Sequence, residues 1–186
     1  MPQAKKRASA RKPAPKATSK KNDALSLLKS DHREVEMLLD EFEKLKKRDN
    51  PQREQIARDI CKKLTIHATI EEEILYPTLR DCFEDDVDLL DEAEVEHGTL
   101  KQLIGDIEDM SIDDELFDAK VKVLGEYVKH HVKEEENEIF KAAEKADLDL
   151  DHLGEELKDR KQELMGEGES DTGRERPSQQ GGTFRV

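Results

Sequence analysis

The chain has 186 residues and a formal net charge of -14, and 42% of its residues are charged against 34% that are hydrophobic. No apolar run approaches the roughly 20 residues of a membrane-spanning helix, and the N-terminus lacks the apolar core of a secretion signal. Two cysteines, Cys61 and Cys82, are too few for a disulfide framework in a chain of this length and favour reduced thiols in the cytoplasm. Glu, Lys, Leu, Asp and Ala dominate, so the composition predicts an all-α protein built from long amphipathic helices.

The two ends of the chain differ from the rest. Residues 1–21 carry eight Lys or Arg and no acid, whereas residues 166–186 are rich in Gly, Ser and Gln. Neither segment can bury a core, so we expect both to be disordered. The basic segment permits weak, non-specific contact with nucleic-acid phosphates that salt would weaken, although the acidic remainder of the chain would repel nucleic acid.

Five helices are expected between these ends. The first four are amphipathic, the Asn-Pro pair at 50–51 should start the second, and Pro77 should bend or end it. A fifth, shorter helix is mostly polar. The expected ranges are 23–47, 50–76, 86–109, 113–145 and 149–165. Short connections between the first four predict an up-down-up-down four-helix bundle over residues 22–147, with 148–165 as an extra C-terminal helix.

Each of the four long helices places one histidine on its apolar face, and the second and fourth add a glutamate four residues later, on the same face. A carboxylate on a core-facing line costs several kcal/mol unless something pairs with it. Imidazoles and carboxylates together are ligands that suit a transition-metal ion. The residues concerned are His32, His67, Glu71, His97, His131 and Glu135.

The intervals repeat between the two halves of the chain. His67, Glu71 and Tyr76 in the second helix recur as His131, Glu135 and Phe140 in the fourth. The histidines of the first and second helices are 35 residues apart, and those of the third and fourth are 34 apart. Two similar helical hairpins are therefore expected to bring two equivalent half-sites together, with Tyr76 and Phe140 closing the bundle.

Four stretches between residues 23 and 145, LLKSDHREVEMLL, HATIEEEILYP, EVEHGTLKQLI and HHVKEEENEIF, resemble the hemerythrin-like, or HHE cation-binding, family in their order and spacing. The resemblance implies a four-helix bundle around two iron ions, a non-haem di-iron centre bridged by an oxo or hydroxo group. By position, it implies that His32 and His67 hold one iron, that His97 and His131 hold the other, and that Glu71 and Glu135 bridge them. It also implies a role in binding, sensing or detoxifying O₂, peroxide or nitric oxide, or in handling iron, in stress defence.

One departure separates this chain from the oxygen-carrying members of that family. They have a second histidine one turn after the third-helix histidine, where this chain has Lys101, and their fourth-helix acid is Asp at five residues rather than Glu at four. The loss of one imidazole would leave an open position at each iron, which favours activation or sensing of O₂ or peroxide over reversible carriage. Catalase-like or oxidase-like turnover, iron storage without turnover, and a metal-free scaffold with a DNA-contacting arm remain alternatives.

Several further residues are candidates for an extra ligand or for a hydrogen bond to the ligands. Glu94 shares a face with His97, and Tyr127 lies one turn before His131, where core packing is an equal alternative. His130 competes with His131, because the oxygen carriers' five-residue spacing would pair His130 with Glu135. The further candidates are Glu94, Lys101, Tyr127 and His130, and Glu72 and Glu134 are expected to be solvated or to contact a ligand. We expect a monomer or a small homo-oligomer.

Overall fold

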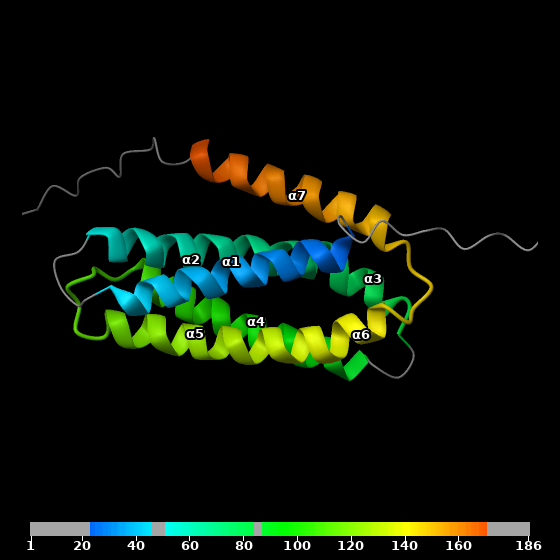
Figure 1. Ribbon diagram of the computed structural model, residues 1–186, viewed down its shortest axis with the longest axis horizontal. Coiled ribbons are helices and arrows are strands. Elements are labelled where there is room, and N and C mark those ends of the chain that lie inside the picture. The colour runs from blue at the N-terminus through cyan, green and yellow to red at the C-terminus, as the bar shows by residue number, and fades with distance from the viewer. Residues whose placement is uncertain (1–22, 46–50, 84–86, 171–186) are drawn as a thin grey trace, which may run out of the picture.

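The computed structural model describes residues 23–45, 51–83 and 87–170, which form helices and turns. Four long helices run alternately up and down the bundle (Figure 1), and each contacts its neighbours in the ring. Their ranges are Ala24–Lys44 (α1), Pro51–Ile70 (α2), Val87–Glu108 (α4) and Phe117–Glu134 (α5). Asp23 caps α1 by accepting a hydrogen bond of 2.7 Å from the backbone N–H of Ser26. The predicted up-down-up-down four-helix bundle with an extra C-terminal helix is confirmed.

Two helices of the bundle contain a π-helical turn that the sequence analysis did not predict. α2 continues as the π-helix Glu71–Leu75 (η1) and then as Tyr76–Arg80 (α3). α5 continues as the π-helix Glu135–Ile139 (η2) and then as Phe140–Ala143 (α6). Each π segment begins at one of the two glutamates predicted to bridge the metal ions, and such turns are frequent at functional sites.

The predicted helix ends need three corrections. The second helix does not end near Pro77, because Pro77 lies at the start of α3, where a missing N–H is tolerated, and helix continues to Arg80. The fourth helix begins at Phe117 rather than at residue 113, because residues 112–116 form turns. The fifth helix, α7, spans Leu150–Ser170, so residues 166–170 are helical rather than disordered. The disorder predicted for residues 1–21 and 171–186 lies outside the described residues.

α7 lies along the outside of the α1–α2 hairpin (Figure 1). Leu153 and Leu157 are buried there, with exposed fractions of 4% and 0%. Arg160 Nε donates a hydrogen bond of 2.7 Å to Glu73 on η1, and Lys161 pairs with Asp31 on α1. These two leucines, with Leu150 and Leu164 packed beside them, and two ion pairs therefore attach a helix that is mostly polar. No helix within the described ranges is long and apolar enough to cross a lipid bilayer.

The core consists of two apolar clusters with a polar layer between them. One cluster surrounds Phe42, Ile60 and Phe117, and the other surrounds Tyr76 and Phe140. Along α1, the residues of the second cluster end at Leu28 and those of the first begin at Val35, and His32 lies between them. The predicted metal ligands lie in this middle layer.

Candidate metal centre

The four helices bring the six predicted ligands together in the polar middle layer, where none is more than 6% exposed. Within the α1–α2 hairpin, the Nε2 atoms of His32 and His67 are 3.0 Å apart. Within the α4–α5 hairpin, the Nε2 atoms of His97 and His131 are 3.1 Å apart. Each hairpin therefore supplies one pair of imidazoles whose Nε2 atoms face the same point, as the internal repeat predicted.

The two glutamates at the start of the π segments connect the histidine pairs. Glu71 Oε1 is 3.1 Å from His67 Nε2, and Glu71 Oε2 is 3.5 Å from His97 Nε2. Glu135 Oε2 is 3.1 Å from His32 Nε2, so this carboxylate of α5–η2 reaches across to α1. The ligand atoms form two groups, His32 with His67, Glu71 and Glu135, and Glu71 with His97 and His131, and within each group they lie within 4.8 Å of one another.

Three carboxylate oxygens of the predicted ligands lack a hydrogen bond of acceptable geometry among the described residues. They are both oxygens of Glu71 and Oε2 of Glu135, in side chains 0% and 1% exposed. Burying such oxygens without partners is costly, whereas a cation among them would compensate their charge. Because imidazole nitrogens and carboxylate oxygens together suit transition-metal ions, the residues present fit a bound metal.

Single histidines of the centre differ in their proton affinity when no cation is present. Burial disfavours the charged form of His67, but the Glu71 charge and the Asp31 carboxylate outweigh burial and raise the pKa of His67 to about 10. Burial and the neighbouring His131 charge lower the pKa of His97 to about 3. Burial also disfavours the charged form of His131, but the Glu96 and Glu135 carboxylates outweigh it and raise the pKa of His131. A proton on one histidine of each hairpin therefore takes part of the place that a cation would fill.

A carboxylate faces the outer nitrogen, Nδ1, of each of the four histidines. The distances are 2.9 Å from His32 to Glu136, 3.7 Å from His67 to Asp31, 3.0 Å from His97 to Glu72 and 2.7 Å from His131 to Glu96. Such partners fix the ring orientation and tautomer and make Nε2 a better ligand. Three of these contacts are short enough for hydrogen bonds, and the one to Asp31 is longer.

Sequence reasoning missed three of these four carboxylates, although their positions carry a signal. Asp31 and Glu96 each immediately precede the first histidine of a hairpin, and each faces the second histidine of its own hairpin. Glu72 and Glu136 each immediately follow a central glutamate, and each faces the first histidine of the opposite hairpin. The repeat could have revealed this pattern, but only Glu72 was considered, as either solvated or in contact with a ligand.

None of the other predicted candidates lies among the six ligands. Lys101 is nearest to them, because it pairs with Glu72, which faces His97, and lines a small cavity beside the four histidines. Glu94 is exposed and accepts a hydrogen bond of 3.0 Å from Arg80. Tyr127 is 44% exposed, so it neither packs in the core nor contacts the centre, and His130 is an exposed neighbour of Glu96 and Glu134. Between His130 and His131, the structure brings only His131 into the centre.

Tyr76 contacts the centre as well as closing the bundle. Its hydroxyl donates a hydrogen bond of 3.4 Å to Glu135 Oε1 and lies 3.5 Å from His97 Nε2. Burial, with the charges of Glu135 and Glu71, raises the pKa of Tyr76 well above its ordinary value, so the phenol keeps its proton. The equivalent position in the other hairpin is Phe140, which stacks on His32 with ring centroids 5.9 Å apart.

A small cavity adjoins the histidines on the inside of the bundle. It has a volume of about 20 Å³, and its walls contain the four histidines, the oppositely charged Asp31 and Lys101, and otherwise only aliphatic residues. The aliphatic residues that line it are Val35, Leu64, Ala68, Leu100, Ile104, Val128 and Val132. A space of this size holds about one water-sized molecule, and its walls favour an uncharged one.

Comparisons with known proteins agree with this geometry. The family model described as hemerythrin HHE cation binding domain matches residues 23–143. A crystal structure of a hemerythrin HHE cation binding domain-containing protein from Mycobacterium kansasii has the same fold, with a TM-score of 0.69 and 20% identity over 82% of this chain and 94% of that one. A protein of Nostoc sp. (strain PCC 7120), described as a DNA nickase, is 33% identical over 119 residues, which is 62% of this chain but only 32% of the relative.

Proposed function

Because the chain belongs to the hemerythrin HHE cation-binding domain family, we propose that its buried centre holds two iron ions and that these bind or sense O₂, peroxide or nitric oxide. His32 and His67 would hold one iron, and His97 and His131 would hold the other. Glu71 and Glu135 would contact both. When bound, the two ions would supply redox chemistry at a site enclosed by the four helices.

The observation that carries this proposal is the position of the Glu71 carboxylate. Its two oxygens face histidines of opposite hairpins, at 3.1 and 3.5 Å, and among the described residues neither has a hydrogen bond of acceptable geometry. A carboxylate that only stabilised the fold would be expected to accept hydrogen bonds at this depth. Two cations, one on each side, would account for both oxygens.

The surroundings of the histidines support a small uncharged ligand. The aliphatic cavity beside them favours O₂ or nitric oxide over a charged molecule. At the opposite edge of the centre, the Tyr76 hydroxyl keeps its proton and donates a hydrogen bond to Glu135 Oε1. The protein would thus offer a mostly apolar space on one side of the ions and a hydrogen-bond donor on the other.

Anaerobic reconstitution with ferrous iron tests this proposal. The metal-free chain would be loaded with Fe²⁺, the iron bound per chain counted, and optical spectra recorded on adding O₂, peroxide or nitric oxide. We expect two irons per chain and a new absorption band with at least one of the three ligands. Uptake of no stoichiometric iron would contradict the proposal and support a metal-free scaffold.

The same loaded protein separates turnover from storage. O₂ evolved repeatedly from peroxide at constant iron content would indicate a catalase-like enzyme. Stable retention of iron without spectral change on adding any of the three ligands would instead indicate iron storage or buffering. Repeated O₂ binding and release without product would indicate a carrier, contrary to the open positions inferred from Lys101.

We further propose accessory nucleic-acid contact through the basic residues 1–21, which lie outside the described residues. The similarity to a protein described as a DNA nickase supports a test with DNA, and the chain spans about a third of the length of that relative. Binding of the full chain to a DNA duplex should weaken steeply with salt and disappear on deletion of residues 1–21. Conversion of supercoiled to nicked plasmid by the loaded protein would extend the proposal to cleavage.

A further inference from the structure

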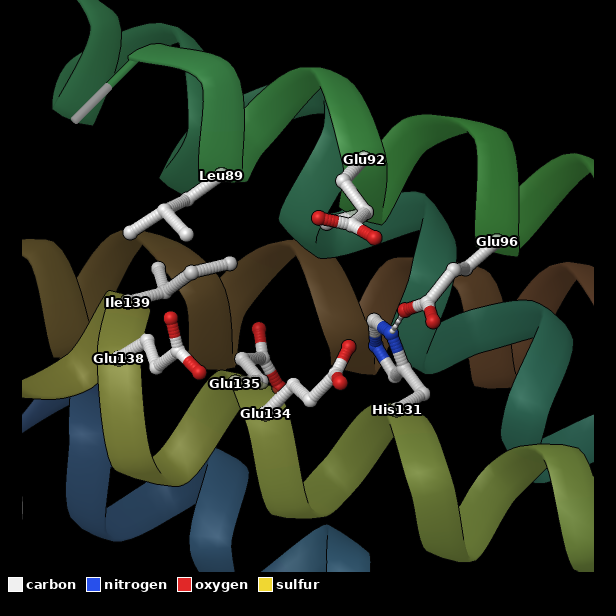
Figure 2. Close-up of a pocket in the computed structure, with 9 residues that line it drawn as sticks. Leu89, Glu92, Glu96, His131, Glu134, Glu135, Glu138 and Ile139 are labelled. Atoms are coloured by element: carbon white, nitrogen blue, oxygen red, sulfur yellow. Dashed lines mark hydrogen bonds and ion pairs between the residues drawn. The ribbon is translucent and has the colours of Figure 1, made fainter.

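A second cavity connects the surface of the α4–α5 hairpin with the centre. It has a volume of about 60 Å³, room for a few water molecules, and lies between α4 on one side and α5 and η2 on the other (Figure 2). Five carboxylates line it, and among its lining residues the only basic group is His131. These carboxylates belong to Glu92, Glu96, Glu134, Glu135 and Glu138.

The inner wall of this cavity belongs to the metal centre. His131 and Glu135 line it and are only 4% and 1% exposed. Among the described residues, Glu135 Oε2 has no hydrogen bond of acceptable geometry, so a buried and incompletely satisfied carboxylate lies at the end of an acidic passage. Figure 2 shows Glu92 projecting from α4 toward the helix that carries Glu134, Glu135 and Glu138, and Glu96 projecting toward His131. One cavity is therefore lined by carboxylates at the surface and by a carboxylate of the centre.

The outer end of the passage has a donor set of its own. Single ligand atoms of Glu96, His130 and Glu134 all lie within 4.8 Å of one another, and His130 Nε2 is 3.6 Å from Glu96 Oε1 and 3.3 Å from Glu134 Oε1. Glu96 also accepts at Oε2 from His131 Nδ1, at 2.7 Å. One carboxylate thus contacts the exposed histidine of this donor set with one oxygen and a buried metal ligand with the other.

Most of the acidic lining is not a requirement of the bundle, because at three of its five positions the other hairpin has an apolar residue. Glu92, five residues before His97, corresponds to Leu27, five before His32. The second helix of each hairpin differs in the same way when the two are aligned at His67 and His131. His130, Glu134 and Glu138 of α5 and η2 correspond in this alignment to Ile66, Ile70 and Ile74 of α2 and η1. Ile70, Leu27 and Ile74 belong to or pack against the apolar cluster that includes Leu153 and Leu157 of α7.

From these observations we propose that Glu96, His130 and Glu134 form a surface site for a divalent metal cation, and that Glu92, Glu134 and Glu138 guide the ion inward to the buried centre. This inference rests on the proposed function, because it requires that the centre bind metal. A passage lined by one sign of charge raises the local concentration of the opposite ion and speeds its capture. Carboxylates and one imidazole also replace part of the water that the ion loses on its way inward.

The rate of metal uptake tests the passage. Co²⁺ would be mixed with the metal-free chain in a stopped-flow instrument and followed by its visible absorption. In a triple variant, Glu92→Gln, Glu134→Gln and Glu138→Gln, we expect the second-order loading rate to fall about tenfold or more and to lose most of its salt dependence. The final amount of Co²⁺ in the buried centre should be unchanged.

A matched control removes the same charge elsewhere. Glu115→Gln, Glu126→Gln and Glu155→Gln alter three exposed acids that do not line the passage, and this variant should load at close to the wild-type rate. Equal rates for the wild type and both triple variants would overturn the inference. A fall of equal size in both variants would also overturn it, because net charge alone would then explain the rate.

Equilibrium titration tests the outer site itself. Zn²⁺ added to the chain after the centre is filled should bind once more, weakly and in rapid exchange, and His130→Gln combined with Glu134→Gln should abolish this extra binding. Absence of the extra ion in the wild type would contradict the outer site. Failure of Fe²⁺ and Co²⁺ to enter the centre at all would contradict the proposed function instead, so the two failures are distinguishable.

Discussion

The two hairpins of the bundle carry the same central residues at the same intervals, yet they differ in what covers them. Over the α1–α2 hairpin, α7 buries an apolar surface, whereas the equivalent surface of the α4–α5 hairpin is acidic and hollowed. Both hairpins contribute equally to the geometry of the centre, because they carry the same central residues. Only the α4–α5 hairpin offers a route from the surface to the centre, because α7 covers the α1–α2 hairpin.

The same contrast appears in the groups that hold the outer carboxylates. Asp31 in the covered hairpin pairs with Lys161 of α7, whereas its equivalent Glu96 in the open hairpin lies 3.6 Å from His130, a residue of its own hairpin. Asp31 is 8% exposed and its side chain is among the polar groups of the buried core. The outer carboxylate of the α1–α2 hairpin therefore has its basic partner on α7, whereas that of the α4–α5 hairpin has its basic partner within the same hairpin.

The largest effect is expected where the hairpins share a residue. Glu71→Gln keeps the size of the side chain but removes the charge that faces both histidine pairs, so we expect metal affinity to fall at both positions, by more than a hundredfold. Iron or Co²⁺ bound per chain after gel filtration measures this effect. His152→Ala, which alters an exposed histidine of α7 outside the centre, is the control and should retain the metal. Loss of one ion only would show that the halves are less coupled than their geometry indicates.

The next effect concerns the cover over one hairpin. Leu157 of α7 is fully buried against the apolar cluster that α7 covers, so Leu157→Ala should lower the free energy of unfolding by about 2–5 kcal/mol, as large-to-small core substitutions do. Val123→Ala on the open hairpin, where Val123 is 39% exposed, should change it by less than about 0.5 kcal/mol. Urea unfolding of the full chain measures both. Similar values for the two variants would mean that α7 does not stabilise the hairpin it covers.

Replacing equivalent outer carboxylates compares the hairpins directly. Asp31→Asn and Glu96→Gln each remove the charge that faces the Nδ1 of a ligand histidine, and such changes typically cost about 10- to 100-fold in metal affinity. We expect the Glu96 variant to lose more, because its contact to His131 is 2.7 Å whereas that of Asp31 to His67 is 3.7 Å. Metal competition against a chelator measures the two affinities. A larger loss in the Asp31 variant would contradict this reading of the distances.

Much of the centre was predictable because the amphipathic pattern is strict there. A histidine and a glutamate one turn apart on an apolar line are costly without a cation, and this cost identified Glu71 and Glu135 from the sequence. The bundle followed from helix periodicity and short connections. The placement of His131 rather than His130 in the core followed from comparison with the register of the other hairpin.

Other features left a weak signal in the sequence or none. The π segments at Glu71 and Glu135 contain residues that suit an α-helix equally well, and tertiary contacts decide between the two. The outer carboxylates are 4 of 46 acids, and only the repeat of their positions beside the histidines and the central glutamates distinguishes them. The apolar side of α7 is narrow, with Leu153 and Leu157 buried and Leu150 and Leu164 packed beside them. Tyr127 lies at a helical position that the actual rotation of α5 turns outward.

A further expected effect is the pH dependence of loading, which distinguishes His67 from His97. The pKa of His67 is about 10 and that of His97 about 3 in the cation-free centre, so at pH 7 a metal ion must displace a proton from His67 but not from His97. Because the pKa of His67 is raised above its unfolded value, its protonated form stabilises the metal-free fold fully below pH 6.5 and loses this effect as pH rises through 10. Metal affinity on the α1–α2 side should therefore rise about tenfold per pH unit between 7 and 9 and level off above 10. Proton release measured with a pH indicator during Co²⁺ loading at pH 8 checks this, with at least one proton per chain expected. Loading without proton release would place a neutral imidazole at position 67 and remove this difference between His67 and His97.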